Sequence, residues 1–131
     1  MGLVCEDVEL KTDDGVRLSG WWMPGGKPER APVVILHGLG ASKAHMIDYI
    51  LLAQEQGNPA LAIDFRGHGG SDPSLTSIGF HESRDVEAAM RFVRERGAGD
   101  PVLWGTSMGA VPALLAAARD GSAAGIIADA P

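Results

Sequence analysis

Cysteine is almost absent from this sequence of 131 residues, since Cys5 is the only one. A single cysteine can form neither an intramolecular disulfide nor a cysteine-based metal site. Clusters of lysine and arginine are absent too, and the formal net charge of −6 argues against nucleic acid or an anionic membrane surface as partner. Residues 1–10 carry acidic side chains where a signal peptide would carry basic ones and a long apolar run. We therefore expect a cytoplasmic protein that acts on a small neutral or amphiphilic molecule.

The composition predicts one folded domain over residues 1–131. Hydrophobic residues make up 45% of the chain and charged residues 21%, which is enough apolar material for a real core. The sequence contains neither an internal repeat nor a low-complexity stretch. Its periodicity can therefore be interpreted as that of a single globular unit.

The first part of the chain predicts an antiparallel hairpin. Apolar and polar residues alternate in 4–10 and 17–23, and the Asp-Asp-Gly segment at 13–15 is typical of the turn between two such strands. The run 33–36 is different because every position is apolar. Such a run is typical of a strand that is covered on both faces, as in a parallel sheet.

From residue 33 onward the pattern alternates between strands and helices. We expect further strands at 60–65, around Val102 and at 125–129, and helices at 43–56, 80–96 and 108–119. Each helix has a predicted inward face. These faces are made of Met46, Ile47, Ile50 and Leu51 in the first helix, of Val86, Ala89, Met90 and Val93 in the second, and of Ala113, Leu114, Ala117 and Ala118 in the third. Right-handed crossovers would make this an α/β fold with a mostly parallel, doubly wound sheet and an amino-terminal antiparallel hairpin.

The chemistry is predicted to centre on Ser107. An apolar run ends in the pattern G-x-S-x-G at 105–109, and an alanine-rich helix follows. A sharp turn between strand and helix can push a serine hydroxyl out of the backbone and aim it at a base. Gly105 and Gly109 would let the strand and the helix approach each other. The alternative is a turn that only joins the two elements.

An anion-binding backbone is expected next to this serine. In an open parallel sheet the binding crevice lies beyond the carboxyl ends of the strands, and the segment 37–40, His-Gly-Leu-Gly, follows the first parallel strand. Gly38 would let the N–H of Leu39 stand beside that of Met108, so that the two form an oxyanion hole. The alternative is a plain flexible turn. We expect His37 to hold the backbone of this loop rather than to act as the catalytic base.

A second loop, residues 64–72, gathers acidic, basic and imidazole side chains among glycines. We interpret it as a structural loop in which Arg66 pairs with a nearby carboxylate and His68 has no special role. Phosphate binding is not expected, because the chain lacks a P-loop lysine and the spacing G-x-G-x-x-G after its first strand.

Together these motifs resemble the α/β-hydrolase superfamily. The resemblance rests on the segments 37–40, 64–71, 105–109 and 129–131, in this order, and extends over essentially the whole chain. It implies that Ser107 is the nucleophile and that Leu39 and Met108 donate to the oxyanion, with His37, Gly38, Gly105 and Gly109 supporting them. A serine at this position resembles esterases, lipases, thioesterases and acyl-peptidases. The resemblance implies neither a metal nor a cofactor.

The sequence departs from that family in one respect. The family places an acid and then a histidine after the nucleophile, whereas no histidine follows Ser107, and the only later carboxylates are Asp120 and Asp129. Asp129 is a candidate for the triad acid, since a few relatives carry the acid there. We expect residues 1–131 to be the amino-terminal half of a hydrolase domain, without the cap and the later strands.

Two functional hypotheses follow, together with one expectation about association. In the first, the parent protein hydrolyses an ester, thioester or amide through an acyl-enzyme on Ser107, with base and acid beyond residue 131. In the second, this chain is a non-catalytic or inactive α/β module. The apolar strand expected at 125–129 would be an open sheet edge, so self-association through it is expected.

Overall fold

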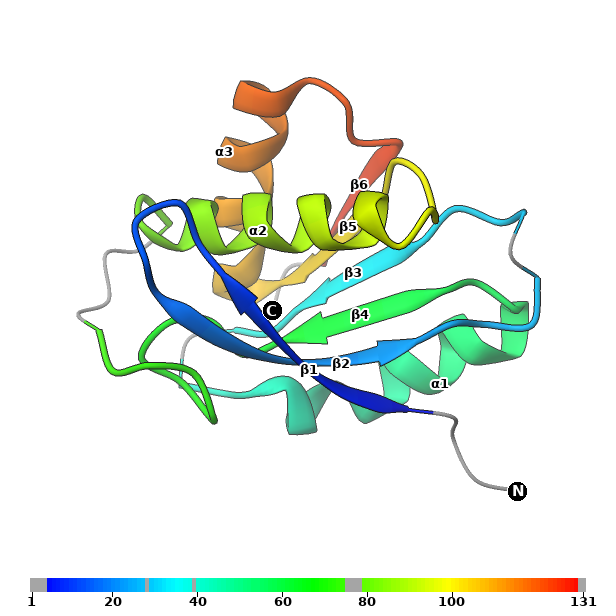
Figure 1. Cartoon of the computed structure of the whole chain (residues 1–131), viewed down its shortest axis with the longest axis horizontal. Coiled ribbons are helices and arrows are strands. Elements are labelled where there is room, and N and C mark those ends of the chain that lie inside the picture. The colour runs from blue at the N-terminus through cyan, green and yellow to red at the C-terminus, as the bar shows by residue number, and fades with distance from the viewer. Residues whose placement is uncertain (1–4, 28, 39, 75–78, 130–131) are drawn as a thin grey trace.

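The computed structural model describes residues 5–27, 29–38, 40–74 and 79–129, and its centre is one mixed sheet of six strands. The strands lie in the order β1-β2-β4-β3-β5-β6 (Figure 1). Their bounds are β1 Glu6–Lys11, β2 Arg17–Met23, β3 Val33–Leu36, β4 Ala60–Ile63, β5 Val102–Thr106 and β6 Gly125–Asp129. The first two form an antiparallel hairpin, β2 also pairs antiparallel with β4, and β4, β3, β5 and β6 run parallel. This confirms the predicted fold class.

Helices cover both faces of the sheet. Their bounds are η1 Lys43–Met46, α1 Ile47–Gln56, α2 Glu82–Glu95, η2 Ser107–Gly109 and α3 Ala110–Asp120, where η marks a 3-10 helix. Figure 1 shows α1 below the sheet and α2 and α3 above it. The predicted segments 43–56 and 108–119 therefore each begin with a short 3-10 turn.

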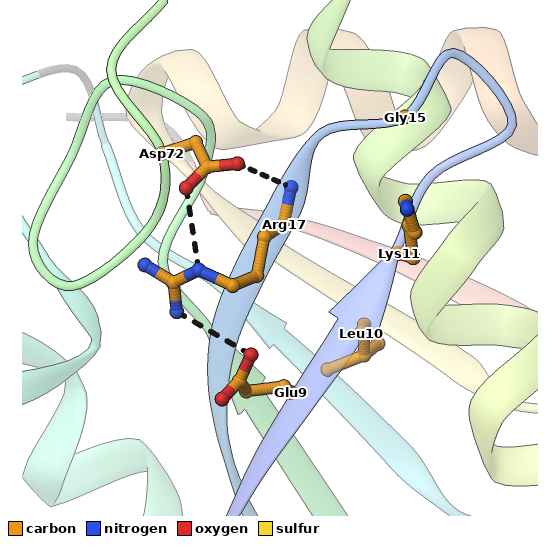
Figure 2. Close-up of a pocket in the computed structure, with 6 residues that line it drawn as sticks. All are labelled: Glu9, Leu10, Lys11, Gly15, Arg17 and Asp72. Atoms are coloured by element: carbon orange, nitrogen blue, oxygen red, sulfur yellow. Dashed lines mark hydrogen bonds and ion pairs between the residues drawn. The ribbon is translucent and has the colours of Figure 1, made fainter.

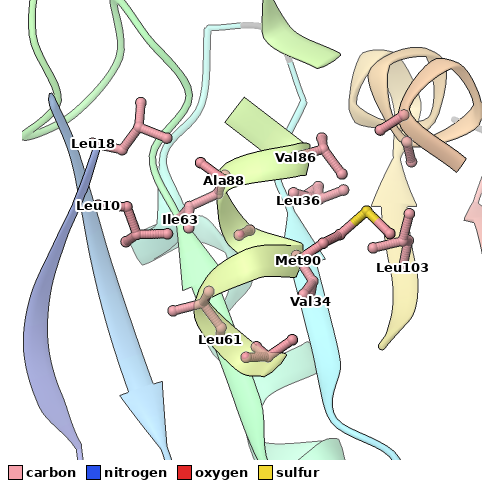
Figure 3. Close-up of a cluster of buried hydrophobic side chains, with 14 of the residues drawn as sticks. Leu10, Leu18, Val34, Leu36, Leu61, Ile63, Val86, Ala88, Met90 and Leu103 are labelled. Carbon is pink, nitrogen blue, oxygen red and sulfur yellow. The ribbon is translucent and has the colours of Figure 1, made fainter. Parts of the chain in front are cut away.

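The strand residues divide the core into two layers because successive side chains point to opposite faces of the sheet. In β3, Val34 and Leu36 face α2, and Figure 3 shows them beneath its Val86 and Met90. Val33 and Ile35 of β3 pack with Met46 and Ile50 on the α1 side. All four β3 residues are buried, so the continuous apolar run is explained by cover on both faces.

The inward faces of two helices differ from the prediction. Ile47 and Leu51 are 38% and 43% exposed, whereas Ile50 and Ala53 are buried. The buried side chains follow the helical spacing i, i+3, and they pack on β3 and β4 at the centre of the sheet. One helix on this face buries only a narrow stripe of its surface. Leu114 of α3 is likewise 51% exposed.

The chain changes direction across the sheet at β3. The crossover through α1 leads from β3 to its neighbour β4, and the crossover through α2 then returns past β3 to β5. The carboxyl ends of β3 and β5 therefore lie side by side, with Leu36 paired to Gly105. Connections that leave adjacent strands in opposite directions open a crevice at that point, which is where open α/β sheets bind ligands.

Candidate active site

Ser107 occupies the sharp turn between β5 and α3. Its φ angle is 52°, and it is the only non-glycine residue with a positive φ in the part of the chain that the structure describes. Thr106 before it is extended, and η2 begins at Ser107 itself. A left-handed conformation is unfavourable for a residue with a Cβ atom, and here it leaves Ser107 exposed at the carboxyl edge of the sheet.

The glycines on either side of Ser107 are required by close backbone contacts. A Cβ atom on Gly105 would stand 2.6 Å from the carbonyl oxygen of Gly109, and one on Gly109 would stand 2.5 Å from the carbonyl oxygen of His37. Both distances are shorter than any normal contact of a Cβ atom. The turn can therefore close against β3 only with glycine at both positions.

The loop after β3 lies directly against the serine. A Cβ atom on Gly38 would be 3.4 Å from the Cβ of Ser107. Of the two expected oxyanion donors, Met108 is the second residue of η2, whereas Leu39 lies outside the described residues. Gly38, the residue before Leu39 in the sequence, thus lies against Ser107.

His37 is engaged by the backbone at both ring nitrogens. Its Nδ1 donates to the carbonyl oxygen of Gly38 at 2.7 Å, and its Nε2 accepts the N–H of Phe65 at 3.0 Å. The ring is almost completely buried, and this burial lowers the pKa of His37 below its ordinary value. A neutral imidazole with both nitrogens engaged supports the loop and has no lone pair available for Ser107.

His68 also contacts this loop, a role that the sequence did not predict. Its Nε2 accepts the N–H of Gly40 at 3.0 Å, and its Nδ1 donates to the carbonyl oxygen of Arg66 at 3.0 Å. The only signal in the sequence was indirect. β3 and β4 are parallel neighbours, so the loops that follow them must leave the sheet side by side.

A buried ion pair also joins the two loops. The Nζ of Lys43 lies 2.6 Å from Oδ2 of Asp64, whose Oδ1 accepts the backbone N–H of Lys43 at 2.7 Å. The N–H of Gly70 donates to the same carboxylate at 3.0 Å. Burial opposes the charge of Asp64, but these hydrogen bonds outweigh it and hold its pKa below the ordinary value.

Arg66 pairs with carboxylates, as the sequence predicted. Its guanidinium lies 2.8 Å from Asp85 of α2 and 2.8 Å from Asp14 in the turn of the hairpin. Hydrogen bonds from Arg66 lower the pKa of Asp14 well below its usual range. Burial raises the pKa of Asp85 to about 6, although its hydrogen bonds to Arg66 act in the opposite direction. Arg66 thus fastens the loop after β4 to two other elements.

Asp129 lies at the end of β6, in register with Thr106 of β5. Its carboxylate accepts a hydrogen bond from the hydroxyl of Tyr49 at 3.3 Å. The ring of Tyr49 stands edge-on to Trp104 at 4.8 Å between centroids, and both aromatic residues pack on the α1 side of the sheet. The candidate acid is therefore one position along the neighbouring strand from Ser107, and its carboxylate is turned toward α1.

A cavity of about 330 Å³ lies elsewhere, on the amino-terminal hairpin (Figure 2). It is lined by Glu9, Leu10, Lys11, Gly15, Arg17 and Asp72. Figure 2 shows the ion pairs of Arg17 with Asp72 at 3.2 Å and with Glu9 at 3.7 Å. None of the predicted site residues lines this cavity, and Glu9, Arg17 and Asp72, three of its four charged residues, already pair with one another.

The described residues hold no group of three or more histidine, cysteine, aspartate or glutamate side chains placed to bind a metal ion. None of their helices combines the length and the apolar character needed to cross a lipid bilayer.

The family comparison and the curated relatives agree with the geometry. A model described as the alpha/beta hydrolase family matches residues 33–131. The chain is 38% identical to the polyketide transferase ATR5 of Stachybotrys chlorohalonatus, over 96% of this chain and 44% of that protein. It is 33% identical to the polyketide transferase af380 of Aspergillus fumigatus, over 88% of this chain and 41% of that protein. The chain thus spans less than half the length of these relatives.

A solved structure is similar over nearly the whole chain. The esterase Pf2001 of Pyrococcus furiosus superposes with a TM-score of 0.89 at 30% sequence identity, covering 98% of this chain and 53% of the esterase. The chain thus spans about half the length of this esterase.

Proposed function

The chain belongs to the alpha/beta hydrolase family, and we propose that it carries the nucleophile of an enzyme that cleaves carboxylic esters, thioesters or amides. The observation that carries this proposal is the φ angle of 52° at Ser107, between β5 and α3. A strained serine at the carboxyl edge of a parallel sheet is the arrangement expected of a nucleophile. The 30% identity to an esterase of known structure supports the same conclusion.

In the proposed reaction, Oγ of Ser107 attacks the carbonyl carbon of the substrate while a general base takes the hydroxyl proton. The carbonyl oxygen becomes an oxyanion that accepts hydrogen bonds from the backbone N–H groups of Met108 and Leu39. Collapse of this intermediate expels an alcohol, thiol or amine together with the proton and leaves an acyl group on Ser107. Water then attacks the acyl group, releases the acid and restores the serine.

We propose that the base and the acid come from a part of the protein outside these 131 residues. The support is that the chain spans 53% of a similar esterase and that both ring nitrogens of His37 and of His68 already contact backbone groups. Loss of the base lowers kcat by about 10⁶ in a serine triad. The isolated chain is therefore expected to hydrolyse p-nitrophenyl acetate little faster than buffer.

The proposal is tested by steady-state hydrolysis of p-nitrophenyl esters by the full-length protein. Ser107→Ala should abolish turnover, while Ser122→Ala serves as the matched control, because Ser122 follows α3 and contacts Asp120 and Arg94. Full turnover by Ser107→Ala would show that another residue is the nucleophile. A full-length protein without any esterase, thioesterase or amidase turnover would favour the non-catalytic module.

Acyl transfer to an acceptor other than water is a second candidate. It is favoured by the 38% identity to a protein named as a polyketide transferase. Transfer and hydrolysis share the acyl-enzyme and differ in the group that attacks it. Added hydroxylamine or a primary alcohol would compete with water for the acyl group, and the ratio of the two products separates transfer from hydrolysis.

The single Cys5 and the net charge of −6 support a cytoplasmic location for this protein and a small-molecule acyl substrate. The proposed chemistry requires neither a metal nor a cofactor, because the nucleophile, base and oxyanion donors are all protein groups.

A further inference from the structure

The loops after β3 and β4 exchange histidine hydrogen bonds. His37, at the end of β3, accepts the N–H of Phe65 from the second loop at 3.0 Å, and His68, in the second loop, accepts the N–H of Gly40 from the first at 3.0 Å. The two rings lie 5.1 Å apart between centroids. Because the loops leave adjacent parallel strands, each supplies the acceptor that the other needs. We call these two residues and their two amide partners the histidine clamp.

The clamp fixes the tautomer of both rings. In each ring Nδ1 lies beside a carbonyl oxygen and Nε2 accepts an N–H. Each Nδ1 must therefore carry the proton, and each Nε2 must keep its lone pair. A proton added to Nε2 of His68 would turn this acceptor into a donor that faces the N–H of Gly40. The hydrogen bond exists only while His68 is neutral.

The two histidines differ in their access to solvent. His37 is 1% exposed, and its burial lowers its pKa, so it stays neutral as the pH falls. His68 is only half-buried. Asp64, which is paired with Lys43, and His45 act electrostatically on His37. Arg66 contacts His68 through its backbone carbonyl, while its guanidinium is directed at Asp85. The clamp therefore has one shielded member and one that protons can reach.

The clamp holds the backbone next to the nucleophile. Gly38 lies against Ser107, and Gly40, the amide partner of His68, is two residues further along. The N–H of Leu39, which lies between them in the sequence, is the proposed second oxyanion donor. Donors of this kind act only if they are held in place before charge develops on the substrate. The hydrogen bond of Gly40 to His68 is therefore one residue along the sequence from the proposed donor.

We propose that His68 is a positioning residue that holds the anion-binding backbone beside Ser107 through Gly40 and releases it on taking up a proton. The proposal rests on the function proposed above only for its effect on catalysis; the hydrogen bond itself does not depend on it. A proton on Nε2 of His68 would remove the acceptor of the Gly40 N–H, so this protonation should lower activity.

Substitutions at His68 separate positioning from simple packing. In His68→Gln the amide oxygen can occupy the place of Nε2 and accept from Gly40 without titrating, whereas His68→Ala removes the acceptor. Removing an oxyanion donor lowers kcat about 10²–10³-fold, so a misplaced donor in His68→Ala should lower kcat by about 10-fold or more, with KM little changed. His68→Gln should restore most of kcat and remove one ionisation from the acid limb of the pH profile. His81→Gln, on the first turn before α2, is the matched control.

The direct measurement is an NMR titration of the isotope-labelled full-length protein. The amide resonance of Gly40 should shift with the same midpoint as the imidazole of His68 in the wild type and should be independent of pH in His68→Gln. A Gly40 amide that ignores the titration of His68 would overturn the proposal, as would a pH profile of kcat left unchanged by both substitutions. If His68→Ala does not fold, the pH dependence of the Gly40 amide in the wild type and in His68→Gln still tests the proposal. The titration also distinguishes a failure of this proposal from a failure of the proposed function. The coupling between the Gly40 amide and the His68 imidazole can be measured even in a protein without esterase turnover.

Discussion

Gly38 lies so close to Ser107 that a Cβ atom on Gly38 would stand 3.4 Å from the serine Cβ and 3.9 Å from its Oγ. These are ordinary contact distances, so an alanine at position 38 fits without a clash. The methyl group would, however, occupy the space beside the hydroxyl, where the proposed oxyanion must sit. This close approach gives a way to change the site without changing the fold.

We expect Gly38→Ala to leave the free energy of unfolding within about 0.5 kcal/mol of the wild type and to lower kcat by about 10-fold or more. Chemical denaturation and ester hydrolysis of the full-length protein measure the two effects. Equal activity in Gly38→Ala and the wild type would mean that the oxyanion does not lie between Gly38 and Ser107.

Gly109→Ala, unlike Gly38→Ala, should lower the stability of the fold. Its Cβ atom would meet the carbonyl oxygen of His37 at 2.5 Å and that of Leu36 at 2.7 Å, and backbone cannot yield as a flexible side chain does. We expect the free energy of unfolding to fall by about 2 kcal/mol or more. Gly26→Ala is the control, because no atom lies within 4 Å of its added Cβ. Equal stability of the two variants would contradict the tight turn.

The alternation of strands and helices could be predicted because β3 and β4 are apolar at every position and because glycine ends several helices, as at Gly57, Gly97 and Gly121. The sharp turn at Ser107 could be predicted because it requires glycine at two fixed positions near the serine in the sequence. The close backbone contacts of Gly105 and Gly109 explain this requirement. Patterns of this kind depend on neighbours in the sequence. They are therefore visible before the fold is known.

The histidine clamp could not be predicted in the same way. His68 and Gly40 are 28 residues apart in the sequence, and their hydrogen bond exists only because β3 and β4 become neighbours. The buried pair of Lys43 and Asp64 depends on the same juxtaposition. The exposure of Leu51 and Leu114 was missed for a related reason. Helical periodicity shows which residues share a face but not how wide a surface the sheet offers to it.

Asp14 should contribute to the acid sensitivity of the fold. Its pKa is lowered in the folded state by hydrogen bonds from Arg66, so the unfolded chain takes up a proton at a higher pH than the folded chain does. The stabilisation is complete above the unfolded pKa of about 3.9 and is lost as the pH falls through the lower folded pKa.

We expect Asp14→Asn to destabilise the protein by about 1 kcal/mol at neutral pH and to show a smaller further loss below about pH 4. Asp13→Asn is the control, because the adjacent pair of Asp13 and Arg84 is largely exposed and surface pairs contribute little. Denaturation curves at several pH values compare the variants. Parallel pH dependences for the wild type and Asp14→Asn would contradict the assignment.

We also propose that the 131-residue chain self-associates through β6. In the described part of the chain β6 pairs only with β5, and Ile126 and Ile127 are 38% and 46% exposed. An exposed apolar strand edge recruits strands from other chains. Ile127→Lys should shift light scattering of the purified chain toward the monomer, whereas Leu52→Lys on α1, at an equal 46% exposure, should change it less. A monomeric wild-type chain at high concentration would contradict the proposal.

The most direct test of the central claim is covalent labelling of the full-length protein with a fluorophosphonate, followed by peptide mass mapping. A nucleophilic serine forms a stable phosphonyl adduct, so we expect one adduct per chain, on the peptide that contains Ser107. The adduct should be absent in Ser107→Ala and unchanged in Ser122→Ala. An adduct on another residue, or one that survives Ser107→Ala, would contradict the assignment of Ser107 as the nucleophile.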